Sequence, residues 1–215
     1  DVYPGSLSKG FTTDAPDLIL YEGYSGGPPI LDQNGDIGPI AYGNPYPKSW
    51  PLFVIYEYDA ATFYTAPGAS NSASLTTSAY GYTTTLPTAT SPIVPLVGVV
   101  QNPNVNGTSF FANQTGAGVA PTLTWSAPSV GTATFYRVRV NLLSNNGGNS
   151  TFTTVAVLST QETSLQIPPG VLTAGQTYVF LINARYSSGL NFAKNPYFLG
   201  PSAGYAGVVS GMIQP

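Results

Sequence analysis

Short strand-like runs that alternate with clusters of turn-forming residues are the feature that most constrains the fold of this sequence. Runs such as "PLFVIYEYD" at 51–59 and "TYVFLINARY" at 177–186 are rich in β-branched and aromatic residues. Turn clusters such as "NNGGN" and "PPG" separate the runs. Apolar residues nowhere recur with helical spacing over the length of a helix. The chain is therefore predicted to be all-β, with almost no helix, and to form β-sandwiches.

The strand predictions divide between two sandwich-like units. Strands are expected near residues 17–24, 51–59, 73–86, 121–127, 134–143, 150–160, 163–168 and 177–186. The segment "LPTATSPIVP", residues 86–95, contains three prolines and suits a stiff linker or the entry to an edge strand. We therefore place a β-rich domain with an extended N-terminal segment at 1–92 and a second sandwich at 93–215.

The second half of the chain carries an ordered series of core-type residues. The series consists of Trp125 in "LTWSAP", Tyr136 in "FYRVRV", Leu165 in "TSLQIP", and Leu172, Gly175 and Tyr178 in "LTAGQTY". Trp125 and Tyr136 on neighbouring strands can fill the centre of a two-sheet core. Over about residues 95–186 the series resembles a fibronectin type III domain. The resemblance implies a spacer or scaffold sandwich in which Tyr178 forms a tyrosine corner, with its hydroxyl bonded to backbone.

The chain departs from the fibronectin type III pattern after residue 186. A short hairpin usually leads into the last strand of the family, whereas this chain inserts "SSGLNFAKNPYFLGPS" before a closing strand in "AGYAGVVSGMIQP". An insertion of this length indicates either a contact surface or a last strand that pairs elsewhere. The tripeptide Arg-Gly-Asp is missing, so the adhesion role that it supports in the family is not implied.

Charged residues are few and unevenly distributed. They make up 7% of the chain, against about 25% in typical globular proteins. Eight of the nine acidic residues lie within positions 1–59, and no charged residue occurs from 60 to 136. Four of the six basic residues follow, namely Arg137, Arg139, Arg185 and Lys194. So few cations and a net charge of −3 argue against a nucleic-acid partner.

Composition also indicates where such a chain works. A surface of hydroxyls, amides and backbone groups stays soluble with little dependence on pH, because few groups titrate. Such a surface favours an extracellular protein. The sequence starts at Asp1, which is consistent with removal of a signal peptide, although an excised fragment would look the same. The apolar run "IVPLVGVV" at 93–100 is far shorter than the roughly 20 residues of a membrane span. We expect a secreted or surface-exposed extracellular protein with no membrane span.

Two patterns that could indicate catalysis favour simpler explanations. "GYSGG" at 23–27 matches the nucleophile-elbow pattern around Ser25, but the chain has no His and two prolines follow in place of a helix. A turn is the better interpretation. Glu57 and Asp59 share one face of a predicted strand, and two carboxylates suffice for glycoside hydrolysis. A solvated strand face is the commoner explanation, and no catalytic residue or enzymatic activity is predicted.

Other residues are candidates for ligands or modification. Asp32, Asn34 and Asp36 in "DQNGDIG" could direct three oxygens at a calcium ion, although Asn34-Gly35 also makes a plain hairpin turn. No other cofactor is predicted. Glycosylation sequons begin at Asn106, Asn113 and Asn149, each in a turn-like polar stretch. Tyr42, Tyr46 and Trp50 form a cluster that could bind a polysaccharide.

The sequences near the two ends of the chain suggest a structural, non-enzymatic function. "DVYPGSLSKGFTT" at 1–13 is an extended segment, interrupted by Gly and Pro, that could insert into the open sheet edge of a neighbouring copy. The acidic N-terminal part would then meet the basic C-terminal part, and such a head-to-tail contact produces a filament. The hypothesis is a self-assembling structural subunit of a filament or coat. The alternative is a binding or spacer module of a secreted multidomain protein, such as an adhesin or a carbohydrate-binding region.

Overall fold

The computed structural model describes residues 2–4, 43–86, 88, 90–91, 93–195 and 202–215, and these residues form strands and loops without a helix. The predicted all-β class is therefore confirmed. The strands are β1 Val2–Pro4, β2 Leu52–Tyr64, β3 Ala73–Thr83, β4 Gln101–Val105, β5 Thr108–Ser109, β6 Gln114–Thr115, β7 Thr122–Ser126, β8 Phe135–Asn146, β9 Asn149–Thr160, β10 Ser164–Gln166, β11 Thr177–Tyr186, β12 Gly204–Val209 and β13 Ile213–Gln214. The strand expected at 17–24 lies outside the described residues.

The chain forms two compact units. One comprises residues 1–56 and 82–93, and the other comprises 57–81 and 94–215. β2 and β3 each run from one unit into the other. The second unit therefore includes 57–81, a segment that the sequence analysis assigned to the N-terminal domain. The division near residue 92 stays a prediction.

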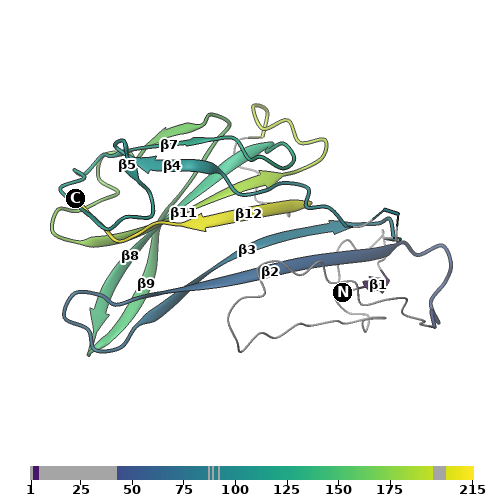
Figure 1. Cartoon of the computed structure of the whole chain (residues 1–215), viewed down its shortest axis with the longest axis horizontal. Helices are drawn as coiled ribbons and strands as arrows, with labels where there is room; N and C mark the ends of the chain where they lie inside the picture. Colours follow the sequence, from purple (N-terminus) through teal and green to yellow (C-terminus); the bar gives the residue numbers. More distant parts are fainter. Residues whose placement is uncertain (1, 5–42, 87, 89, 92, 196–201) are drawn as a thin grey trace. The chain divides into compact units, whose positions relative to one another are not determined.

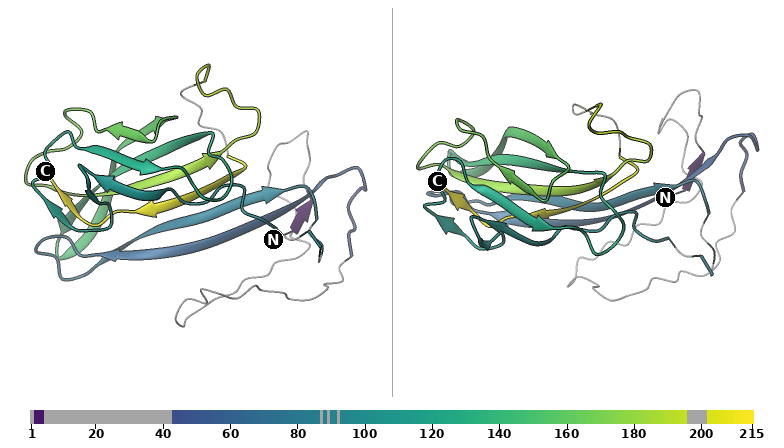
Figure 2. Two further views of the ribbon diagram at one scale, coloured as in Figure 1. Left: turned by 45° about the horizontal axis from the view of Figure 1, so that its top comes forward. Right: turned by 90° about the horizontal axis from the view of Figure 1, so that it is seen from above.

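The second unit is a sandwich of two layers, seen in Figure 1 and from two further directions in Figure 2. One layer is the small sheet with strand order β10-β7-β4-β5. In the other layer, which we call the large sheet, β9, β8, β11, β12 and β3 are successive neighbours, and β13 continues beside β11. Antiparallel layers of this kind are the architecture that the resemblance to fibronectin type III domains implies.

The core between the layers follows from side-chain alternation along β8 and β11. Val138, Val140, Phe180 and Ile182 are fully buried, because alternate residues of a strand point to one face. Trp125 on β7 meets Tyr136 on β8 edge to face, with ring centroids 5.3 Å apart. The two rings predicted to fill the core therefore lie in contact inside it.

A hydrogen bond ties Tyr178 to the loop that precedes its strand. The backbone N–H of Thr173 donates to the Tyr178 hydroxyl at 2.9 Å, and the Tyr178 ring is buried. Leu172 is buried beside this bond, and Gly175 has a φ of +78°, a backbone conformation that favours glycine. This is the geometry of a tyrosine corner.

The closing strand pairs within its own sandwich. β12 runs antiparallel to β11 from the pair Tyr186–Gly204 to the pair Leu181–Val209. On its other side β12 also pairs with β3. The described part of the insertion, 187–195, places the Phe192 ring on Phe135, with centroids 5.0 Å apart.

The part of the β2–β3 hairpin that belongs to the second unit, residues 57–81, contacts the large sheet in two places. Its tip reaches the tip of the β8–β9 hairpin, where the Ser150 N–H donates to the Asn71 carbonyl at 2.9 Å. The Asn71 side chain also donates to the Asn149 side-chain oxygen at 2.9 Å. A second small core lies here, made of Tyr64, Ala66, Leu143 and Val179. The hairpin is therefore held at its tip as well as along β12.

In the first unit, β1 is an edge strand. Val2, Tyr3 and Pro4 pair antiparallel with Val54, Phe53 and Leu52 of β2. Phe53 is buried, and its ring lies 6.0 Å from that of Tyr82 between centroids. The start of the chain therefore adds a strand to β2 of the same chain.

Candidate functional site

The edge of β12 is paired along only part of its length. β12 pairs with β11 as far as Val209, but with β3 only from Gly204 to Ala206. Beyond Ala206 the two strands separate, as Figure 1 shows for β3 and β12. The Ser210 N–H donates to the Phe180 carbonyl on β11. Because backbone groups alternate in direction along a strand, those of Gly207 and Val209 point away from β11.

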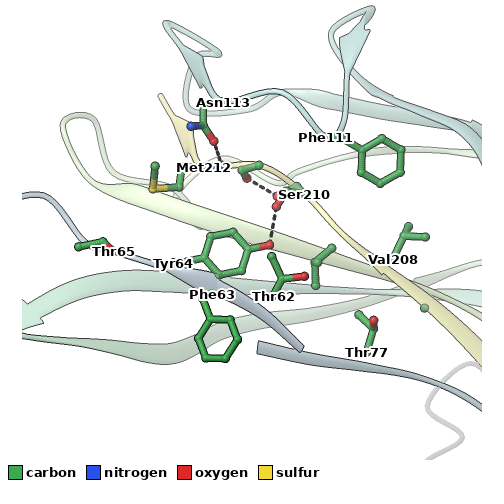
Figure 3. A pocket seen from close by; sticks show the side chains of 13 residues that line it. Thr62, Phe63, Tyr64, Thr65, Thr77, Phe111, Asn113, Val208, Ser210 and Met212 are labelled. Atoms are coloured by element: carbon green, nitrogen blue, oxygen red, sulfur yellow. Dashed lines mark hydrogen bonds between the residues drawn. The ribbon is translucent and has the colours of Figure 1, made fainter. Parts of the chain in front are cut away.

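A groove of about 630 Å³ opens where β3 leaves β12. Figure 3 shows its lining residues, which come from three parts of the second unit. They are Thr62, Phe63, Tyr64, Thr65 and Thr77 from the hairpin, Phe111 and Asn113 from the loop between β5 and β6, and Gly207–Met212. None of these residues carries a formal charge. We call this feature the β12 groove.

Hydrogen bonds fix the far end of the β12 groove. The Tyr64 hydroxyl donates to the Ser210 carbonyl at 2.7 Å, and the Met212 N–H donates to the Asn113 side-chain oxygen at 2.8 Å (Figure 3). The Ser210 hydroxyl accepts the Phe180 N–H at 2.8 Å. Burial raises the pKa of Tyr64 to about 12, so its hydroxyl stays protonated and able to donate further into the alkaline range than an unperturbed tyrosine. The hairpin is thus pinned to the segment that follows β12.

Two exposed aromatic residues line the β12 groove. The Phe63 side chain is 72% exposed and that of Phe111 is 59% exposed. The Phe63 ring points away from Tyr64 and Ser210, on the other side of β2, so Phe111 is the exposed ring that faces the groove (Figure 3). The groove thus combines an open strand edge, hydroxyl groups and an apolar ring, a set that fits binding of an extended chain better than acid–base chemistry.

Glu57 and Asp59 are exposed on β2 and do not line the β12 groove. Burial and, to a lesser extent, the neighbouring Asp59 raise the pKa of Glu57. Asp59 accepts a hydrogen bond from the Ser78 hydroxyl. The two carboxylates therefore lie on an exposed stretch of β2, outside the β12 groove.

Several residues singled out in the sequence fall outside the described part of the chain. They are Ser25, Asp32, Asn34, Asp36 and Tyr42, so the calcium loop stays a prediction. Within the described ranges, no group of three or more His, Cys, Asp or Glu side chains could hold a metal ion. Tyr46 and Trp50 stack on each other, with centroids 5.7 Å apart and planes 12° apart.

The three sequon asparagines are exposed but differ in their contacts. The Asn106 amide donates to the Ala117 carbonyl at 2.8 Å and accepts from the Thr122 N–H at 2.9 Å. Asn149 accepts from Asn71 at the hairpin tips. Asn113 lines the β12 groove. Glycosylation stays a prediction at all three, and at Asn113 a glycan would lie at the groove.

Comparison with known proteins gives little further guidance. No family model and no curated protein matches the chain. A crystal structure of the rat CD45 extracellular region, domains d3-d4, is similar over 92% of this chain and 83% of that chain, at 10% identity and a TM-score of 0.30. No helix long and apolar enough to cross a membrane occurs among the described residues.

Sequence reasoning missed the β12 groove. The groove depends on where the β3–β12 ladder ends, and no local pattern records this because the two strands are far apart in the sequence. In the local sequence, only the pair Gly207 and Gly211 points to the groove, because glycines allow other groups to approach the backbone closely. A Cβ at Gly207 would collide with the Asn183 side chain, and one at Gly211 with the backbone of Ala112.

Proposed function

We propose that this chain is a non-catalytic structural subunit of an extracellular surface or filament, and that the β12 groove accepts an extended strand from a neighbouring copy. The observation that carries the proposal is the open edge of β12 beyond Ala206. An added strand would find the backbone groups of Gly207 and Val209 as hydrogen-bond partners.

The lining of the β12 groove supports an uncharged occupant. Thr77 from β3 and the exposed ring of Phe111 flank the open edge, and no carboxylate or cation lines the groove. Desolvating a charge there would cost free energy without an opposite charge to offset it. An extended, mostly uncharged segment fits best.

Residues 1–13 are the proposed donor. Val2–Pro4 already adds to the edge of β2, which supports the ability of this segment to act as a strand. In an assembly it would leave β2 of its own chain and pair with β12 of a neighbour, an exchange of the domain-swapping kind. Because donor and acceptor are different surfaces, the contact does not close on itself and extends into a fibre.

A matched pair of substitutions on β3 tests the acceptor. Thr77 lines the β12 groove, whereas its neighbour Thr76 is exposed and does not. Thr77→Arg places a long cation in the groove, and Thr76→Arg adds the same charge to the other face of the strand. Negative-stain electron microscopy should show fibres for the intact chain and for Thr76→Arg, and none for Thr77→Arg or a chain lacking residues 1–13.

Other outcomes would contradict the proposal. If the intact chain forms no fibres at high concentration, the strand-donation mechanism is wrong and the spacer or binding module becomes the better account. If fibres form from Thr77→Arg as readily as from Thr76→Arg, strand donation does not use the β12 groove. Circular dichroism on each variant verifies that the sandwich has folded.

A further inference from the structure

The large sheet of the second unit has an outer face, turned away from the small sheet, on which side chains form aligned rows. Residues paired in register share a face, and Arg185 alternates with the core residue Ala184. One row across β3, β12, β11 and β8 consists of Tyr80, Tyr205, Arg185 and Phe135, and Phe135 is buried beneath Phe192 of the insertion. The next rows add Arg137 and Arg139, because they follow Phe135 at alternate positions along β8.

One half of this face is positive. Arg185 lies over the Tyr205 ring, with Cζ 5.2 Å from the centroid, and Arg137 lies over the Phe135 ring at 5.7 Å. Such stacking holds planar guanidinium groups in place. Arg139 is exposed, and neither Arg139 nor Arg185 makes an ion pair with any residue that the structure describes. Burial, followed by the charges of Arg137 and Arg139, lowers the pKa of Arg185 to about 10.

The other half is negative. Asp59 on β2 accepts a hydrogen bond from Ser78, which lies two residues before Tyr80 and therefore on the outer face. Glu57 lies two residues before Asp59 and shares that face. Both carboxylates are exposed, and neither forms an ion pair within the described ranges. Tyr205 lies between the halves: burial and then Glu57 raise its pKa, while Arg185 lowers it.

We propose that this face, defined by Glu57, Asp59, Arg139 and Arg185 and called the charged face, pairs with the same face of a second copy. A two-fold axis near Tyr205 brings the arginines of each copy over the carboxylates of the other. The same exchange occurs twice, as a two-fold interface requires. Val155 and Val157 on β9, 42% and 52% exposed, supply apolar contact beside the arginines.

This pairing does not depend on the proposed strand donation. Glu57, Asp59, Arg139 and Arg185 do not line the β12 groove. Elsewhere on the outer side of the large sheet, Leu143 and Val179 are covered by Tyr64 of the hairpin. Thr77→Arg, which blocks the groove, therefore leaves the charged face able to pair. In that full-length variant, a dimer can be measured without fibres.

Charge reversal tests the pairing in the Thr77→Arg variant. Arg139→Glu or Asp59→Arg, measured by sedimentation equilibrium at low ionic strength, should raise the dimer dissociation constant about tenfold or more, because like charges then face each other. The double variant Arg139→Glu with Asp59→Arg restores opposite charges and should recover the dimer. Lys48→Glu makes the same charge change at an exposed position in the first unit and serves as the control.

The results separate this inference from the proposed function. A monomeric Thr77→Arg chain at all concentrations, or a dimer that Lys48→Glu weakens as much as Arg139→Glu does, would overturn the pairing. Failure of the double variant to restore the dimer, while its denaturation midpoint matches the parent, would also overturn it. A dimer in the absence of any fibre by the intact chain would support the charged face and reject strand donation.

Discussion

The Tyr64 hydroxyl donates a hydrogen bond of 2.7 Å to the Ser210 carbonyl, joining the end of β2 to the segment after β12. This bond closes one end of the β12 groove (Figure 3). The ring is also anchored by Phe152, which it meets edge to face with centroids 5.6 Å apart. Tyr64 therefore sets how far the hairpin lies from the open edge.

Replacing Tyr64 by Phe should loosen the hairpin without unfolding the sandwich. The ring keeps its packing, but the buried Ser210 carbonyl loses its donor, which costs about 1–3 kcal/mol. We expect a lower denaturation midpoint and faster hydrogen exchange at the end of β2. Unchanged exchange in β2 would show that the bond does not position the hairpin.

Alkaline pH should weaken the same contact. The pKa of Tyr64 is about 12 in the folded chain and 10 when unperturbed, and burial is the main cause. Because the folded value is the higher one, the stabilisation is complete below pH 10 and is lost as pH rises towards 12. Wild type should lose more free energy of unfolding than Tyr64→Phe between these pH values. Other titrating groups, such as Arg185, are present in both chains, so their contributions cancel in the difference. Parallel losses would contradict the assignment.

Replacing Tyr178 by Phe should destabilise the sandwich by about 1–3 kcal/mol, because the Thr173 N–H then loses its acceptor. Chemical denaturation measures the effect, and Tyr58→Phe, at an exposed position on β2, is the control. If the midpoint of Tyr178→Phe equals that of the control, the corner does not stabilise the fold.

Most of the longer strands of the sandwich could be predicted from the sequence, because β-branched and aromatic residues mark them locally, whereas β4 at Gln101–Val105 was not predicted. The expected strand 177–186 coincides with β11, in which Phe180, Ile182 and Ala184 are buried in the core. The end of β2 was missed: the pattern predicted residue 59, whereas the strand continues to Tyr64 through exposed residues that carry no alternation.

Long-range pairing could not be predicted in the same way. Nothing near Tyr80 indicates that its partner is Tyr205, because the pairing depends on the free side of β12 in the folded sandwich. The charged face was foreseen only as an uneven distribution of charge along the chain. Its assembly on one side of the large sheet requires the register of β8, β11 and β12.

A glycan at Asn113 would reach the same groove. Asn113 is exposed and begins an Asn-Gln-Thr sequon in the lining of the β12 groove. Wild-type protein that carries a glycan at Asn113 should therefore form fewer fibres than the Asn113→Gln variant produced in the same cells, because the sugar would occupy the space of the added strand. Mass spectrometry establishes occupancy, and equal fibre yields at full occupancy would contradict the proposed acceptor.

Residue-resolved hydrogen exchange tests strand addition most directly. In the unassembled chain, the N–H groups of Gly207 and Val209 point away from β11 and should exchange faster than that of Ser210, which is bonded to Phe180. On assembly, the account predicts strong new protection at Gly207 and Val209, because a neighbour's strand bonds to them. Fibres in which these two groups exchange as fast as in the unassembled chain would contradict it.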